Sequence, residues 1–145
     1  MKRKSQRRLK KLLEENMPEG HAYFNGYLRV DKKYSIDLVL QNIGEHTLEF
    51  DGYPVKMWSL RYQTFRKSLF CAVCGKEGKH FRLEKHALHA NIERNSFHFN
   101  LYTIDNNGNE LLMTKDHIIP KAKGGRNHIS NLQTMCTICN RNKGS

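Results

Sequence analysis

The chain has 145 residues and a formal charge of +11, from 25 lysines and arginines against 14 aspartates and glutamates. This charge favours a polyanionic partner such as a nucleic acid, although a basic protein without such a partner has the same signature. No apolar run approaches the roughly 20 residues of a membrane-spanning helix, so a membrane span is excluded. The hydrophobic share of 38% predicts a modest core, which a bound metal would help to stabilise.

The first 17 residues predict a basic helix that Pro18 ends. Its apolar residues form a thin stripe, so a helix that docks on DNA and a frayed, solvated terminus both remain open. Only Leu12 and Leu13 separate the basic start from the acidic Glu14, so no secretory leader is predicted. A cytoplasmic location is therefore the default, and metal binding explains the cysteines better than disulfides do.

The segment after this helix predicts a second helix followed by a hairpin. Apolar residues recur at helical spacing over 34–43, and Asp31 is available as the cap. The apolar stretches 47–50 and 53–57 flank an Asp-Gly pair, which is a strong signal of a tight β-turn. We therefore predict that residues 1–58 form a basic N-terminal extension with helices and a hairpin.

The rest of the chain, residues 59–145, is predicted as a separate domain that begins with a short helix. Ser59 can cap this helix, which we expect over 60–67. Three of its side chains add positive charge. They are Arg61, Arg66 and Lys67.

The C-terminal half predicts a strand pair, a third strand and a helix. The paired strands are expected over 97–104 and 110–114, on either side of a turn rich in Asn and Gly. A short strand is expected over 132–135 and a short helix over 137–143. His117 is then expected just past the end of a strand.

The four cysteines occur as two CxxC pairs, Cys71/Cys74 and Cys136/Cys139. Each two-residue spacer suits one edge of a tetrahedron, and four thiolates make a closed structural Zn²⁺ site. The glycine at Gly75 permits the tight turn that brings two thiolates to one ion. Free buried thiols and a redox CxxC are the alternatives, whereas a catalytic zinc is disfavoured because four thiolates leave no open position.

The stretch TKDHIIPKAKGGRNHISNLQTMCTICNRNK, from Thr114 to Lys143, concentrates the groups that phosphodiester hydrolysis requires. A neutral histidine such as His117 can take a proton from water near pH 7, because its ordinary pKa is about 6.5. Asp116 offers a carboxylate oxygen and Asn140 an amide oxygen, which suit Mg²⁺ or Mn²⁺ better than zinc. With only two protein ligands, such an ion keeps open positions for water and phosphate.

The joint pattern DHxxP, GG, NL and CxxCNxxK resembles the HNH endonucleases. The resemblance implies an α+β fold with a ββα-metal core, here stapled by the four-cysteine zinc site and preceded by the basic helical extension. It implies that His117 is the general base and that Asp116 and Asn140 are ligands of the catalytic ion. Asn131 would brace the loop so that the histidine faces the attacking water. Because the last position holds Asn rather than His, this chain is an H-N-N variant.

The resemblance also implies the reaction and its setting. Double-stranded DNA would be nicked or cut with a single divalent ion, leaving 5′-phosphate and 3′-hydroxyl ends. A monomer would favour nicking, and a homodimer could cut both strands. The compact, stand-alone type is common in phage genomes, which points to the cytoplasm of a bacterial or phage-infected cell. The alternatives are a non-catalytic, zinc-stabilised DNA-binding module and an RNA-cleaving variant.

Basic residues near the motif are candidate DNA contacts. Lys143 lies one helical turn after Asn140, where its charge can meet a phosphate or simply face solvent. Three more surround the paired glycines and resemble a phosphate-gripping loop, with a solvated turn as the alternative. They are Lys121, Lys123 and Arg126. His86 and His89 could share a helix face and bind metal, although satisfied or exposed histidines are the stronger interpretation.

Overall fold

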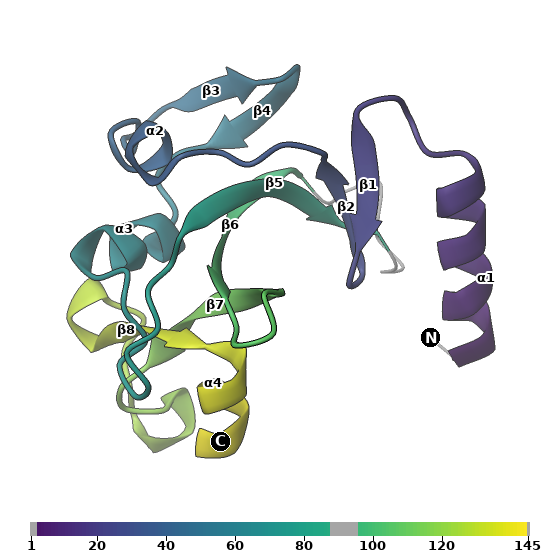
Figure 1. The fold of residues 1–145 in the computed structure, drawn as a ribbon. Coiled ribbons are helices and arrows are strands. Elements are labelled where there is room, and N and C mark those ends of the chain that lie inside the picture. The colour runs from purple at the N-terminus through teal and green to yellow at the C-terminus, as the bar shows by residue number, and fades with distance from the viewer. Residues whose placement is uncertain (1–2, 88–95, 145) are drawn as a thin grey trace.

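The computed structural model describes residues 3–87 and 96–144, and in them six antiparallel strands form one sheet in the order β1-β2-β5-β6-β7-β8 (Figure 1). The strands of this sheet are β1 (His21–Phe24), β2 (Tyr27–Val30), β5 (His80–His86), β6 (His98–Ile104), β7 (Glu110–His117) and β8 (Leu132–Cys136). A separate hairpin consists of β3 (Thr47–Phe50) and β4 (Tyr53–Lys56). The helices are α1 (Arg3–Glu15), α2 (Ile36–Leu40), α3 (Leu60–Lys67) and α4 (Thr137–Lys143), with 3-10 turns η2 (Lys121–Lys123) and η3 (Ile129–Asn131). The prediction of a mixed fold of helices and strands is confirmed.

The sheet has one apolar and one polar face, because successive side chains point to opposite sides of a strand. On β5 and β6, Phe81 stands opposite Leu101 and Leu83 opposite Phe99, and all four are fully buried. Helices α2 and α3 and the β3-β4 hairpin pack against this apolar face (Figure 1). The opposite face carries charged and polar side chains, and the candidate site lies around the β7-β8 end of the sheet.

Several predicted elements are confirmed. Helix α3 spans Leu60–Lys67 with Ser59 as its cap, and α4 spans Thr137–Lys143. The β3-β4 hairpin turns at the Asp-Gly pair. The helix predicted over 34–43 is shorter, and Ser35 rather than Asp31 caps it, because the Ser35 hydroxyl accepts from the backbone of the first helical turn.

One prediction about a histidine is wrong. His117 does not lie beyond a strand end, because it pairs with Leu132 and is the last residue of β7. His86 belongs to strand β5 and not to a helix, so the weaker alternative, a helix face shared with His89, does not hold. His89 itself lies outside the described residues.

Strands from both sides of residue 58 share one sheet, because β2 pairs with β5. The division into 1–58 and 59–145 stays a prediction. Helix α1 lies beside β1, at the sheet edge opposite β8 (Figure 1). There the Lys10 ammonium lies 5.4 Å from the centre of the Tyr23 ring. Among the described helices, none combines the length and apolar character that crossing a membrane requires.

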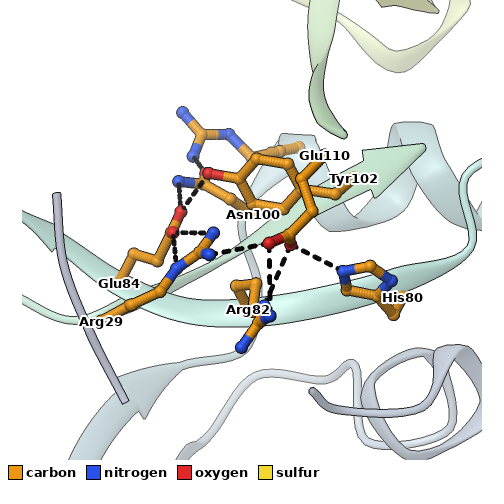
Figure 2. Close-up of polar contacts among 8 residues, drawn as sticks. Arg29, His80, Arg82, Glu84, Asn100, Tyr102 and Glu110 are labelled. Carbon is orange, nitrogen blue, oxygen red and sulfur yellow. Dashed lines mark hydrogen bonds and ion pairs between the residues drawn. The ribbon is translucent and has the colours of Figure 1, made fainter. Parts of the chain in front are cut away.

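A buried ion network on the polar face ties the β1-β2 hairpin to β7 (Figure 2). Arg29 on β2 donates from Nε to Glu84 at 2.7 Å and from Nη1 to Glu110 at 2.8 Å. Glu110, the first residue of β7, also accepts from His80 at 2.7 Å and from Arg82 at 3.0 Å. Such buried charges are tolerated only when they are paired. The network therefore fixes the start of the strand that ends in the candidate site.

Replacement of Glu110 by glutamine is expected to destabilise the fold in a pH-dependent way. Burial raises the pKa of Glu110, but hydrogen bonds from Arg82, His80 and Arg29 outweigh it and lower the pKa from 4.5 to about 2. The ionised carboxylate therefore stabilises the fold fully above pH about 4.5, and this contribution is lost as the pH falls through about 2. At pH 7 we expect Glu110→Gln to lower the free energy of unfolding by about 3 kcal/mol.

Urea unfolding of both proteins at pH 7 and pH 3 measures this effect. The difference between them should fall to less than half at pH 3, because the unfolded wild type then already binds the proton. Glu77→Gln is the matched control, since Glu77 pairs with Lys79 on the surface and should cost less than about 1 kcal/mol. A Glu110→Gln difference that is equal at both pH values would contradict the assignment.

Candidate functional site

The four cysteines converge on one point, although they come from two distant segments. Their sulfur atoms all lie within 4.8 Å of one another. Cys74 Sγ and Cys136 Sγ are 3.9 Å apart. Tetrahedral zinc, with Zn–S distances of about 2.3 Å, requires S–S edges of about 3.8 Å. The cluster therefore fits a closed site for an ion such as Zn²⁺.

The first CxxC turn is folded by its glycine and fixed to β8. Gly75 adopts a φ of 78°, and its N–H donates to the carbonyl of Cys71 at 3.0 Å. The N–H of Ala72 donates to the carbonyl of Thr134 at 2.9 Å. The Thr134 hydroxyl in turn donates to the carbonyl of Ser68 at 2.6 Å. The turn is thus held against the strand that carries Cys136.

The second CxxC pair opens helix α4, and the thiols influence each other. Cys136 Sγ caps the helix by accepting from the N–H of Cys139 at 3.4 Å. Burial raises the pKa of Cys71, but backbone hydrogen bonds, led by one from Cys136, outweigh it and lower the pKa to about 6. The pKa of Cys139 is raised, first by its hydrogen bond with Cys136. Neighbouring thiolates need a cation to ionise together, which agrees with the fit to zinc.

Asp116 lies near the end of β7, and its carboxylate is mostly buried. Gln133 stands opposite it on β8 and donates from Nε2 to Oδ2 at 3.0 Å. Lys143, from α4, donates from Nζ to the same oxygen at 2.8 Å. A strand and a helix therefore both hold this carboxylate in place.

Asn140 reaches the same side of β7 from helix α4. Its Nδ2 donates to the hydroxyl of Thr114 at 2.9 Å. Thr114 lies two residues before Asp116, so both side chains share one face of the strand. Within the described residues no hydrogen bond reaches Asn140 Oδ1. A carboxylate and an amide oxygen thus lie on one side of β7, and both are donors that suit Mg²⁺ or Mn²⁺.

His117 is half-buried and is the last residue of β7. Its Nε2 lies 3.2 Å from Asn127 Oδ1. Because an amide oxygen only accepts, Nε2 carries the proton and Nδ1 is left as the basic nitrogen. The carbonyl of His117 accepts from Lys143 Nζ at 2.8 Å. Lys143 therefore contacts both residues of the Asp-His pair.

Asn131 clamps the loop that connects β7 to β8. Its Oδ1 accepts from the N–H of Ile119 at 2.8 Å. Its Nδ2 donates to the carbonyls of Ile119 at 3.0 Å and Arg126 at 2.9 Å. Its own carbonyl accepts from the N–H of Ile118 at 2.8 Å. These bonds fix the backbone that directly follows His117.

The paired glycines are required by the packing of this loop. Gly124 has a φ of 88°, in the left-handed region. A Cβ on Gly125 would lie 1.7 Å from the carbonyl oxygen of Ile119. The N–H of Gly125 donates to the carbonyl of Pro120 at 2.9 Å. The loop is therefore folded closely onto the segment after His117.

The four basic residues predicted to contact DNA differ in their environments. Lys143 is engaged by Asp116 and by the carbonyl of His117. The others are exposed on the loop. They are Lys121, Lys123 and Arg126.

Other residues that hold the site were not singled out from the sequence for this role. Lys67 was predicted only as a positive charge, but its Nζ donates to the carbonyls of Ile129 at 3.1 Å and Leu132 at 3.0 Å, on either side of Asn131. Thr114, Asn127 and Gln133 are neutral and polar, so their types carry no signal. Only the β7-β8 register could have placed Gln133 opposite the carboxylate.

Comparison with known proteins supports the resemblance. Residues 105–145 match the family model described as HNH endonuclease. The matched segment contains β7, β8 and α4, so the resemblance to this family is confirmed there and a nuclease-type hydrolase is supported. No curated protein and no solved structure matched the chain.

Proposed function

We propose that this chain is a metal-dependent endonuclease that hydrolyses phosphodiester bonds of double-stranded DNA. His117 acts as the general base, and Asp116 and Asn140 hold one divalent ion, Mg²⁺ or Mn²⁺. The single observation that carries the proposal is the match of residues 105–145 to the HNH endonucleases. The hydrogen bonds that hold these side chains around the end of β7 add support.

In the proposed reaction, Nδ1 of His117 takes a proton from a water that attacks the scissile phosphorus. The bond from phosphorus to the 3′ oxygen breaks and this oxygen takes a proton from solvent water, which leaves a 3′-hydroxyl and a 5′-phosphate. When bound, the divalent ion supplies positive charge to the phosphoryl and leaving oxygens. Asn127 keeps the imidazole in the required tautomer, and Asn131 keeps the following backbone from shifting the ring. One chain has one such base, so a monomer favours nicking and a homodimer can cut both strands.

The zinc cluster has a separate, structural role in this proposal. Four thiolates close the coordination shell, so the ion has no position for substrate. The four-cysteine site instead fastens residues 71–74 to the start of α4, the helix that carries Asn140 and Lys143. Lys143 holds the Asp-His pair, and its charge can also meet a phosphate at the site.

The proposal predicts that Asp116→Ala loses cleavage and keeps zinc. The substitution removes a ligand of the catalytic ion, and we expect the rate to fall by at least about 100-fold. Plasmid nicking and elemental analysis of the same preparation measure both effects. Asp37→Ala, at an exposed carboxylate on α2, is the control and should retain the rate. If Asp116→Ala also loses zinc, the two metal sites are not independent and the assignment fails.

A further inference from the structure

We propose that Arg61 and Lys115 form a second phosphate site, which holds a backbone phosphate of the nucleic acid beside the candidate active site. The inference rests on the proposed function, because it assigns two further residues to the binding of the same substrate. The two cations come from two different elements, namely α3 and β7. The family match covers Lys115 but does not reach Arg61.

Arg61 is held by an amide rather than by a carboxylate. Its Nη1 donates to Asn100 Oδ1 at 2.8 Å. Asn100 is buried, and its Nδ2 donates to Glu84 Oε1 at 2.7 Å (Figure 2). Glu84 in turn forms its ion pair with Arg29, at 2.6 Å. The neutral amide thus fixes the guanidinium of Arg61 without cancelling its charge.

The two cations line the same recess, and both side chains are half-buried. Among the ion pairs formed within residues 3–87 and 96–144, none involves either of them. Partly buried like charges without a counter-ion are unfavourable. An anionic ligand would remove this repulsion, and phosphate is the anion that a nuclease substrate supplies.

A recess at this point gives the anion a place to bind. Strand β7 pairs with β6 only as far as Leu112 and with β8 from Met113 onward, so β6 and β7 part here. The opening has a volume of about 130 Å³ and is lined by residues that include Tyr27, Arg61 and Lys115. It is far too small for a duplex, so only a backbone group can enter it.

The recess adjoins the candidate site through a shared side chain. Thr114 lines the recess and also accepts the hydrogen bond from Asn140. A phosphate held by Lys115 would therefore lie close to the one that is cut. The other basic residues of α3 are used elsewhere, since Lys67 binds loop carbonyls and Arg66 lines a different pocket beside Trp58.

The test is the salt dependence of DNA binding, measured by fluorescence anisotropy with a labelled duplex of about 20 base pairs and no added Mg²⁺ or Mn²⁺. The double variant Arg61→Gln/Lys115→Gln should bind about tenfold more weakly near physiological salt. The slope of log affinity against log salt should become about 1 less negative, which corresponds to one lost phosphate contact. The control Lys32→Gln/Lys79→Gln removes two charges from exposed ion pairs, and its slope should not change.

A second pair of substitutions, Arg61→Lys/Lys115→Arg, keeps both charges and should restore the slope. Equal slopes in the neutral variant and the wild type would overturn the proposal. Equal losses of DNA affinity in the neutral variant and in the control would also overturn it. The rise in melting temperature that inorganic phosphate produces is a further measurement. If the neutral variant loses this rise but keeps the wild-type slope with DNA, the cluster binds free phosphate only and the proposal fails.

Cleavage of plasmid is measured separately, so the proposed nuclease activity and the proposed phosphate site can fail independently. An uncut plasmid together with a cluster-specific change of slope would reject the nuclease and keep this phosphate site. A cut plasmid together with an unchanged slope would keep the nuclease and reject this phosphate site.

Discussion

Replacement of His117 by alanine is expected to lower the rate of DNA cleavage by at least about 100-fold, and up to about 10,000-fold, the range that a general base contributes. The reason is that Nε2 is committed to Asn127, at 3.2 Å, which leaves Nδ1 free to accept a proton. Initial rates of nicking of supercoiled plasmid with Mg²⁺ or Mn²⁺ measure the change. The zinc content and the melting temperature of the variant should stay at wild-type values.

The loop offers a matched control for this prediction. His128 lies on the same loop, and its ring contacts Ser130 rather than the candidate site. His128→Gln should therefore change the rate by less than about threefold. Added imidazole should restore part of the rate of His117→Ala, because it replaces the missing base. A His117→Ala rate close to wild type, or an equal loss in both variants, would reject His117 as the base.

Removal of one cysteine is expected to unfold much of the protein. Zinc binding to such sites is worth roughly 10–16 kcal/mol in small domains, whereas a whole domain is stable by only about 5–15 kcal/mol. The core is modest, with 38% hydrophobic residues, so little else compensates. Cys71→Ser should lose zinc, and its cooperative thermal transition should weaken or disappear.

Elemental analysis and thermal unfolding test this second prediction. The wild type should carry about one zinc per chain, and a chelator should reproduce the effect of Cys71→Ser reversibly. Cys74→His serves as the control, because histidine can also bind zinc and should recover part of the stability. A Cys71→Ser protein that keeps both its zinc and its melting temperature would show that the cluster is not a zinc site.

The C-terminal half of the fold could be predicted well because its signals are local. The helix over 137–143 and the strand before it follow from short apolar runs and clear ends. The convergence of the cysteines could be predicted because a repeated CxxC spacing is typical of metal ligation. The relative placement of Asp116 and His117 was harder to predict from the sequence, because it depends on how far β7 extends. Pairing with Leu132 makes His117 the last residue of the strand, directly after Asp116.

The strands β2 and β5 could not be predicted, because they contain buried polar residues. Arg82 and Glu84 on β5 look like surface residues in the sequence, yet they are 9% and 0% exposed. They are buried only because Arg29 and Glu110 arrive from distant parts of the chain to pair with them. Sequence spacing cannot show such long-range pairing. The role of Lys67 is hidden for the same reason, since its carbonyl partners lie in the loop before β8 and at the start of that strand.

The most direct test of the central claim is incubation of the unmodified protein with supercoiled plasmid, with and without Mg²⁺ or Mn²⁺. The account predicts nicked or linear plasmid only when the divalent ion is present, with 5′-phosphate and 3′-hydroxyl at the new ends. Plasmid that stays intact while its gel mobility shifts would contradict the account, because the chain would then be a zinc-stabilised DNA-binding module without catalysis.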